Sequence, residues 1–512
     1  MSNYIGIDFG MQNLKVCYYD GRKNIRVDLE GNQSSSSKVS KNVVYYAENE
    51  EMVLHKFFFG SQQAEEARKY GDEDYIRYIK RELQKENFSR SVCGGKYVLT
   101  AMHIITDIFR QIHLKMSESR YDVDAETILT VPVIFSEAQK AMLKVCAENA
   151  GFRIREIITE PFAALFSEEI FDNCIDDIDD KEYVLMFDFG ASTLDICLFG
   201  IENEDDKLSV EVISSTGLSY GGKDITDAVT AFLMEKYSDI VEGEIQAGRL
   251  DEESKKATFF DYAEEMKNEL YEEEDVPESE RKLYGSKLVL KRTNVDKILD
   301  SSKIWDKIAV AISDMFDSTD EFSSDDYAIV NKVVMTGGTS KIQYFRDKVE
   351  ELFGNAELVG DLEEEDTIYC SVSSGAVNYA RQTDISVTNS SPMNIGIEIG
   401  NGFEKALNRN SFYNISGKRK QIKRKWLEAN GWKFKVYQTL ETVREHTDVN
   451  DENILYSGII ELNRDLYTDN EEDIIIQLRL TTSGIVAVAA SVQEVKNIVE
   501  DNILLSSEVR YD

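Results

Sequence analysis

Two stretches of the chain share one pattern of apolar and polar positions. Residues 184–187 are continuously apolar, a carboxylate follows at Asp188, Gly190 turns the chain, and a second apolar run begins at Leu194. This order predicts a buried strand, a tight turn and a returning strand, which together make a β-hairpin with a polar tip. Residues 4–19 repeat the pattern at an offset of 180 residues.

An internal repeat of this kind predicts two similar lobes in the folded protein. The second tip adds the hydroxyls of Ser192 and Thr193 and the carboxylate of Asp195. Backbone N–H groups at a glycine turn can face a phosphate, and nearby carboxylates suit Mg²⁺, so we expect the two tips to hold one magnesium nucleotide between them. The matching positions are Asp8, Phe9, Gly10, Leu14, Val16 and Cys17 in the first stretch, and Asp188, Phe189, Gly190, Leu194, Ile196 and Cys197 in the second.

The segment between the two hairpins predicts a strand, a helix and another strand. Residues 127–151 begin with an apolar strand, after which Ser136 and Gln139 form a capping box that opens a helix, and Gly151 closes it. Residues 153–160 predict the next strand, which ends at a Glu-Pro pair.

Two other segments carry candidate site residues. In residues 74–83 the apolar side chains share one helical face, which predicts a helix with Lys80 at its edge. Residues 333–342 predict a strand, a Gly-Gly turn and a helix capped by Thr339 or Ser340.

Beyond residue 392 the pattern changes to short alternating stretches, such as 433–437, 474–480 and 485–489. Period-two alternation between polar turns predicts an antiparallel β-domain, and the polar stretch before it is interpreted as a linker. The basic run 418–425 is interpreted as a solvated strand edge that deters sheet pairing.

Charge and composition exclude several classes of function. Residues 385–512 hold 15 Lys and Arg against 19 Asp and Glu, so almost all of the formal net charge of −37 lies on residues 1–384. A surface this negative opposes nucleic-acid binding. No apolar run reaches the roughly 18 residues of a membrane span, no secretory signal opens the chain, and the six scattered cysteines signal neither zinc nor disulfides. We expect a cytoplasmic protein with no nucleic-acid or membrane partner.

Several motifs resemble those of the heat-shock 70 kDa chaperone family (DnaK-like), in the superfamily of actin and hexokinase. They are the repeated D-F-G tips, T-V-P at 130–132, F-S-E-A-Q at 135–139 and E-P-F-A-A at 160–164. The resemblance implies an α/β, two-lobed, actin-like ATPase domain with duplicated ribonuclease-H-like cores, followed by an antiparallel β-sandwich domain. It places the ATPase domain at residues 1–382, a linker at 383–392, and a substrate-binding-like β-sandwich without the helical lid at 393–512.

The resemblance also implies the roles of individual residues. Lys80 holds the attacking water and stabilises charge building on the γ-phosphate, and Glu160 reaches the metal-bound water. The implied catalytic residues are Lys80, Glu160, Asp188, Thr193, Asp195 and Asp8, of which Asp8 and Asp188 hold Mg²⁺. The implied residues for ATP or ADP are Gly10, Met11, Gln12, Gly190, Ala191, Ser192, Gly221, Gly222, Glu264, Lys267, Asn268, Gly337, Gly338, Lys341 and Ile342.

Two of these assignments compete with other interpretations. Residues 217–224 match a P-loop except at the last position, where Asp224 lacks the metal-binding hydroxyl and would repel a phosphate, so we reject a P-loop there. The resemblance makes Glu264 and Lys267 an adenosine clasp, although a surface ion pair at i and i+3 would explain the same spacing.

The chain departs from the family at both tips, and the departures predict slow hydrolysis. Met11 and Gln12 stand where the family has two threonines, which removes two hydroxyls. Ala191 and Ser192 stand where it has glycines, and a side chain at positive φ costs about 1–2 kcal/mol. Lys341 replaces the arginine that stacks on adenine, which weakens that planar contact.

Two further departures predict altered coupling to partners. Glu156 stands where the family has an arginine that receives an acidic residue of a J-domain co-chaperone, so an ordinary J-domain would be repelled. The leucine-rich linker is reduced to Ile385 and Val387 among polar residues, which predicts weak docking of the linker.

These inferences predict a chaperone that binds ATP, hydrolyses it slowly, and binds unfolded or extended polypeptide through its C-terminal domain. A specialised J-domain co-chaperone or a nucleotide exchange factor is the implied partner. Two alternatives remain, namely a nucleotide-sensing assembly protein with little hydrolysis and a small-molecule kinase of the same superfamily. The kinase would leave the C-terminal β-domain unexplained.

Overall fold

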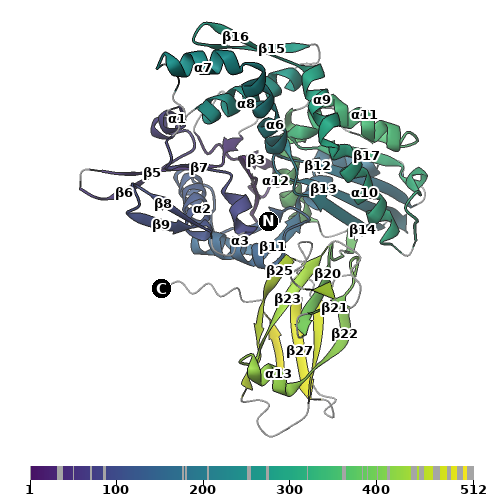
Figure 1. Cartoon of the computed structure of the whole chain (residues 1–512). Coiled ribbons are helices and arrows are strands. Elements are labelled where there is room, and N and C mark those ends of the chain that lie inside the picture. Colours follow the sequence, from purple (N-terminus) through teal and green to yellow (C-terminus); the bar gives the residue numbers. More distant parts are fainter. Residues whose placement is uncertain are drawn as a thin grey trace.

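The computed structural model of the chain is a mixed α/β fold with two large sheets in its first part and two antiparallel sheets in its last part (Figure 1). The structure describes residues 2–30, 39–49, 51–69, 72–84, 88–175, 178, 181–204, 207–248, 250, 255–272, 276–319, 321–359, 365–382, 385–388, 390–399, 402–411, 415–439, 447–448, 455–464, 473–480, 486–492 and 500–503.

Both predicted hairpins are confirmed, and each is the antiparallel part of a six-stranded sheet. In each sheet the first hairpin strand also pairs in parallel with a later strand, which in turn pairs in parallel with another. The first sheet has the order β11-β10-β1-β2-β3, with β4 paired to β2, and contains β1 (Tyr4–Phe9), β2 (Asn13–Tyr19), β3 (Asn24–Arg26), β4 (Ser40–Lys41), β10 (Glu126–Val131) and β11 (Arg153–Thr159). The second has the order β18-β17-β12-β13-β14-β19 and contains β12 (Glu182–Phe189), β13 (Leu194–Glu204), β14 (Lys207–Leu218), β17 (Lys332–Thr336), β18 (Glu357–Val359) and β19 (Ser386–Thr388).

Helices bury the faces of these sheets, because their apolar sides meet the continuous apolar runs of the strands. One core lies on the first sheet under α2 (Ala101–Glu118) and α3 (Glu137–Asn149). A second core lies under α6 (Gly222–Lys236), α8 (Lys255–Glu272), α9 (Arg292–Ser302), α10 (Ile304–Asp317) and α11 (Gln343–Leu352). Between the sheets, a third core includes α4 (Glu160–Leu165), α5 (Glu168–Ile175) and α12 (Glu365–Arg381), and α12 contacts strands of both sheets.

Smaller elements complete this part of the chain. They are β5 (Val43–Glu48), β6 (Leu54–Phe58), α1 (Gln62–Lys69), β7 (Tyr75–Arg77), η1 (Ile79–Gln84), β8 (Ser89–Val92), β9 (Tyr97–Thr100), α7 (Ser238–Gln246), β15 (Glu278–Leu283), β16 (Ser286–Lys291), η2 (Tyr327–Ile329) and η3 (Gly338–Lys341).

The capping box of α3 is confirmed, but two sequence predictions about helices are wrong. Residues 74–83 do not form one helix, because β7 pairs with β5 and Tyr78 then takes the left-handed φ of 63°, so that only the short 3₁₀ helix η1 follows. Thr339 and Ser340 do not cap a helix either. They lie inside η3, and the following α11 begins after Ile342 without a side-chain cap.

The C-terminal part contains two antiparallel sheets that share one apolar core, which confirms the predicted antiparallel β-domain. The basic run 418–425 begins on β22, a strand at the edge of its sheet, as predicted, but its last three residues lie beyond β22 at the start of α13. The sheets have the orders β24-β21-β20-β23-β25 and β22-β26-β27-β28 and contain β20 (Asn394–Ile399), β21 (Gly402–Leu407), β22 (Ile415–Ile422), β23 (Lys433–Thr439), β24 (Thr447–Asp448), β25 (Leu455–Glu461), β26 (Ile474–Leu480), β27 (Val486–Val492) and β28 (Glu500–Ile503), with α13 (Arg424–Ala429) between β22 and β23.

The linker docks on the second large sheet, and the weakness predicted for this docking stays a prediction. Strand β19 pairs in parallel with β14 at the edge of the second large sheet, and Ile385 and Val387 pack against the third core. Backbone pairing needs no leucine, so the polar side chains between them do not prevent it. Ser390 Oγ then donates to Val212 O at 3.0 Å, and the buried Arg409 donates to Ser215 O, so the C-terminal sheets rest against the second large sheet.

Candidate functional site

The tips of the two hairpins face a cavity of about 800 Å³. Two of the predicted site residues do not line it. Asp195 is fully buried beside it, and Gly221 is the N-cap residue of α6. The predicted residues that line the cavity are Asp8, Gly10, Met11, Gln12, Lys80, Glu160, Asp188, Gly190, Ala191, Ser192, Thr193, Gly222, Glu264, Lys267, Asn268, Gly337, Gly338, Lys341 and Ile342.

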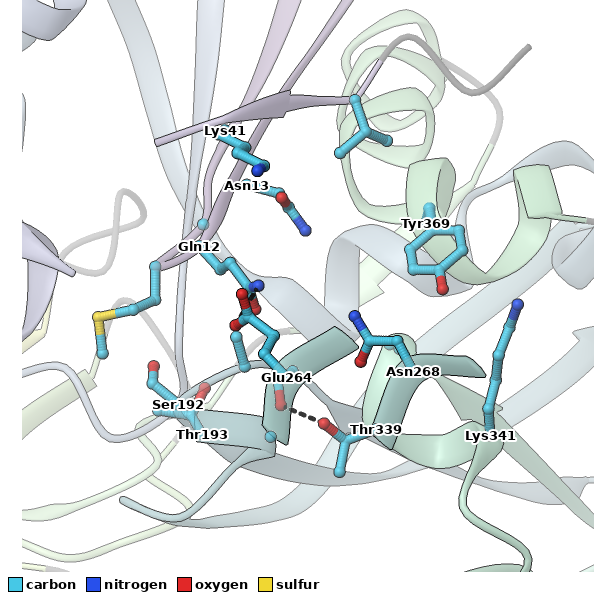
Figure 2. A pocket seen from close by; sticks show the side chains of 18 of the residues that line it. Gln12, Asn13, Lys41, Ser192, Thr193, Glu264, Asn268, Thr339, Lys341 and Tyr369 are labelled. Atoms are coloured by element: carbon cyan, nitrogen blue, oxygen red, sulfur yellow. Dashed lines mark hydrogen bonds between the residues drawn. The ribbon is translucent and has the colours of Figure 1, made fainter. Parts of the chain in front are cut away.

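The second tip is held by hydrogen bonds that bring three segments together. Gly190 N donates to Thr193 O at 2.9 Å, which closes the hairpin turn. Gly190 O accepts from Gly222 N at 3.1 Å. It also accepts from Thr339 Oγ1 at 2.8 Å, the bond drawn as a dashed line at Thr339 in Figure 2. A Cβ on Gly337, at φ 82°, would lie 2.4 Å from Phe189 O, so only glycine allows η3 to approach the tip this closely.

The strain predicted for the second tip is wrong. Among the described residues, the non-glycine positions with positive φ lie elsewhere, so Ala191 and Ser192 avoid the left-handed region and its cost of about 1–2 kcal/mol. The close approach of α6 to the second tip instead requires a glycine at position 221, because a Cβ there would come within 2.4 Å of Ser192 N.

Buried carboxylates gather at the end of the cavity beside the two hairpin tips. Burial and the charge of Glu160 raise the pKa of Asp188 to about 7, and the same two causes raise the pKa of Asp195. Asp195 Oδ1 accepts from Val133 N at 2.6 Å, while its buried Oδ2 has no hydrogen-bond partner. This end of the cavity therefore favours a cation.

Two lysines already lie among these carboxylates. Lys80 Nζ lies 2.8 Å from Glu160 Oε1, so the predicted catalytic lysine and glutamate are in direct contact. Lys15 Nζ lies 2.6 Å from Asp8 Oδ2. Burial lowers the pKa of Lys15, but the charges of Asp8 and Asp188 and the hydrogen bond to Asp8 together raise it above that of a free lysine. Sequence reasoning missed Lys15, which the hairpin register places directly opposite Asp8.

The donor set suits Mg²⁺ bound together with phosphates. Among the described residues, no group of three or more His, Cys, Asp or Glu side chains is placed to hold a metal alone. Mg²⁺ usually keeps several waters and binds through one or two carboxylates and substrate phosphates. The buried Asp8 and Asp188, which both line the cavity, fit that mode.

Polar and aromatic side chains line the other end of the cavity. Gln12 and Glu264 point toward each other in Figure 2, and Gln12 Nε2 donates to Glu264 Oε1 at 2.8 Å. Lys341 Nζ lies 4.8 Å from the ring centroid of Tyr369, and both line the cavity. Tyr369 was missed by sequence reasoning, because no motif marks it. The first-tip residue Gln12 thus reaches across to the predicted clasp.

Lys267 is a buried cation and not a surface residue. Its Nζ donates to Gly222 O at 3.1 Å and to Thr226 Oγ1 at 3.0 Å, so the alternative of a solvent-exposed pair with Glu264 is wrong. Burial lowers its pKa to about 8, below the value of 10.5 of a free lysine.

This shift predicts a pH dependence of stability. Between pH 8 and pH 10.5 the unfolded chain keeps a proton that Lys267 has lost in the folded chain, so the free energy of unfolding should rise with pH across this window. Replacing Lys267 with methionine should raise the free energy of unfolding at pH 7 by up to about 3 kcal/mol. The same replacement should remove most of the increase in the free energy of unfolding between pH 8 and pH 10.5. Urea unfolding at several pH values measures both, and an unchanged pH profile in Lys267→Met would contradict the prediction.

Ion pairs connect the two sides of the cavity. Asp261, on α8, accepts from Arg68 Nη1 at 2.9 Å and from Arg77 Nη1 at 3.2 Å, both from the part of the chain that follows the first hairpin. Arg81 Nη2 lies 3.3 Å from Asp224 Oδ1 on α6. These pairs hold elements of the two halves together, and none was expected from the sequence.

Comparison with known proteins finds similarity along the whole chain. A family profile described as "Hsp70 protein" matches residues 4–510. The chaperone protein DnaK of Buchnera aphidicola subsp. Schizaphis graminum (strain Sg) is 22% identical over 444 residues. The matched region is 80% of this chain and 65% of that protein, so the match spans a little less than two thirds of the relative's length. Within the described residues, no helix is long and apolar enough to cross a membrane.

Proposed function

The chain belongs to the Hsp70 family, and on that premise we propose that it is a chaperone that binds ATP and ADP in the cavity between its hairpin tips, hydrolyses ATP slowly, and holds extended polypeptide on its C-terminal sheets. The observation that carries the proposal is that two hairpins with matching carboxylates, from two sheets of matching strand order, face one cavity.

The proposed architecture has three parts. Residues 1–382 form a two-lobed actin-like ATPase domain, 383–392 form a linker, and 393–512 form a substrate-binding β-sandwich. The shared order of the two large sheets supports duplicated lobes, and the single core of the two C-terminal sheets supports a sandwich.

The nucleotide phosphates would lie against the hairpin tips, and the base would lie near Lys341 and Tyr369. The start of η3 brings backbone N–H groups to the second tip, which suits phosphate. At the other end, Glu264, Lys267 and Asn268 on α8 would clasp the ribose.

The proposed hydrolytic residues are the charged groups at the phosphate end. Lys80 would orient the attacking water and stabilise charge on the γ-phosphate, and Glu160 would position Lys80 through their 2.8 Å contact. Asp195 and Thr193 would accept and relay the proton of the water. Bound Mg²⁺, held by Asp8 and Asp188, would neutralise phosphate charge.

The same geometry supports slow hydrolysis. Met11 and Gln12 offer no hydroxyl to the phosphates, and the Gln12 side chain is engaged by Glu264. Since the second tip is not strained, the slowness is attributed to the first tip alone.

Binding of Mg-ADP and Mg-ATP is the first test. At about 100 times the dissociation constant, a ligand should raise the free energy of unfolding by about 2.7 kcal/mol and the melting temperature by a few degrees. Calorimetry should show binding of one nucleotide per chain. An unchanged melting temperature and no heat at millimolar Mg-ATP would contradict the proposal.

ATP turnover with and without an unfolded peptide tests the chaperone activity. We expect slow turnover that the peptide accelerates. Turnover that is undetectable under both conditions, with nucleotide binding intact, would favour the nucleotide-sensing assembly protein.

Coupling to a J-domain should be altered. Glu156 Oε1 accepts from Tyr379 Oη at 3.2 Å, and burial raises the pKa of Glu156, so this carboxylate is tied to α12. An acidic J-domain residue would meet a like charge there. We expect an ordinary J-domain to leave ATP turnover unchanged. Strong stimulation that Glu156→Lys abolishes would show that the site works with its reversed charge.

A further inference from the structure

Lys15, which the β1–β2 register places opposite Asp8, is a second cation in addition to Lys80 at the tip end of the cavity. Lys15 lies on β2, lines the cavity, and has a side chain 17% exposed, against 4% for its partner Asp8. The ammonium is therefore within reach of a ligand in the cavity while it is anchored at 2.6 Å to a buried carboxylate.

The two lysines serve different carboxylates. Lys80 pairs with Glu160, and Lys15 pairs with Asp8. The charge of Asp8 is thereby balanced by the chain itself. A fixed ammonium thus already supplies part of the positive charge that phosphates need at this end.

We propose that Lys15 binds the nucleotide phosphates directly and makes the affinity for nucleoside diphosphates and triphosphates only weakly dependent on a divalent metal. The inference rests on the proposed nucleotide-binding function. An ammonium beside the first tip and a divalent ion held there attract the same phosphate charge. The gain in nucleotide affinity from one of these cations is therefore smaller when the other is present. Because Lys15 also contacts Asp8, it competes with the metal for that carboxylate.

Titration calorimetry of ADP with the full chain, in millimolar Mg²⁺ and again in excess EDTA, tests the proposal. For the wild type, removing Mg²⁺ should weaken binding by less than about tenfold. In Lys15→Met, removing Mg²⁺ should weaken ADP binding by a further factor of about 10 to 100. This factor is on the order of what one charged hydrogen bond contributes to binding. Lys41→Met is the matched control, because Lys41 also lines the cavity but is exposed, and it should behave as the wild type.

The outcomes separate this proposal from the proposed function. If the wild type binds no ADP even with Mg²⁺, the nucleotide-binding function is wrong and the role of Lys15 falls with it. If the wild type binds with Mg²⁺ but loses binding 100-fold or more in EDTA, or if wild type and Lys15→Met lose the same factor, only the role of Lys15 is overturned. The wild-type arm decides the question even if Lys15→Met does not fold, and Lys15→Arg, which keeps the charge, should retain weak metal dependence.

Discussion

Replacing Lys80 with alanine is expected to lower ATP turnover by about 100-fold or more, while Mg-ADP affinity changes by only a few fold. The Lys80 side chain is 4% exposed, and its ammonium lies 2.8 Å from Glu160 Oε1 and 5.1 Å from the ring centroid of Phe135, so its position is fixed before any ligand arrives. A preorganised charge aimed at developing negative charge contributes on the order of 100- to 1,000-fold to a rate. Nucleotide binding depends on many other contacts along the cavity, which the substitution leaves in place.

Single-turnover hydrolysis and calorimetry with Mg-ADP measure the two quantities. Lys41→Ala is the matched control, because it removes an exposed lysine from the rim of the same cavity. Removing Lys80 leaves Glu160 without its cation, so melting curves with and without Mg-ADP should establish that the variant is folded. A folded Lys80→Ala protein that hydrolyses ATP as fast as the wild type would remove Lys80 from the mechanism.

Replacing Asp261 with asparagine is expected to accelerate ADP release by roughly tenfold. Asp261 accepts from Arg68 and Arg77 across the cavity, and its side chain is 20% exposed, so the two contacts are partly shielded from water. A charged hydrogen bond contributes about 1.5–3 kcal/mol when it is removed from water, and less where solvent screens it. Since these bonds must break for the two halves to separate, weakening them should speed the opening that releases nucleotide.

Stopped-flow displacement of a fluorescent ADP analogue measures the release rate. Asp227→Asn is the control, because Asp227 pairs with Lys223 inside α6 and not across the cavity. The wild-type rate should rise with salt, since salt screens charges that are not deeply buried, and the Asp261→Asn rate should rise less. Equal release rates for wild type and Asp261→Asn would show that these pairs do not limit opening.

Local sequence patterns were sufficient to predict those elements whose geometry depends only on residues close in the chain. The apolar runs on each side of Gly10 and Gly190 set both hairpins, and the Ser136–Gln139 capping box set the start of α3. The repeat identified the two tips that face one cavity. These features depend on strand periodicity, turn chemistry and capping, all of which act within a few residues.

Other features were decided by contacts between residues far apart in the chain. Residues 74–83 have a helical pattern, but pairing of β7 with β5 and the left-handed Tyr78 overrode it. The linker lacks leucines, but the open edge of β14 offered backbone partners to β19.

Within the site, the sequence by itself identified many of the residues that line the cavity, and the tertiary structure decided what each side chain contacts. Lys15 and Tyr369 carry no motif and became visible only when the fold placed them in the cavity. Gln12 was assigned to phosphate but reaches Glu264, which lies 252 positions away. The physical reason is that burial, charge pairing and cavity lining depend on distances in space, and such distances follow from packing and not from sequence spacing.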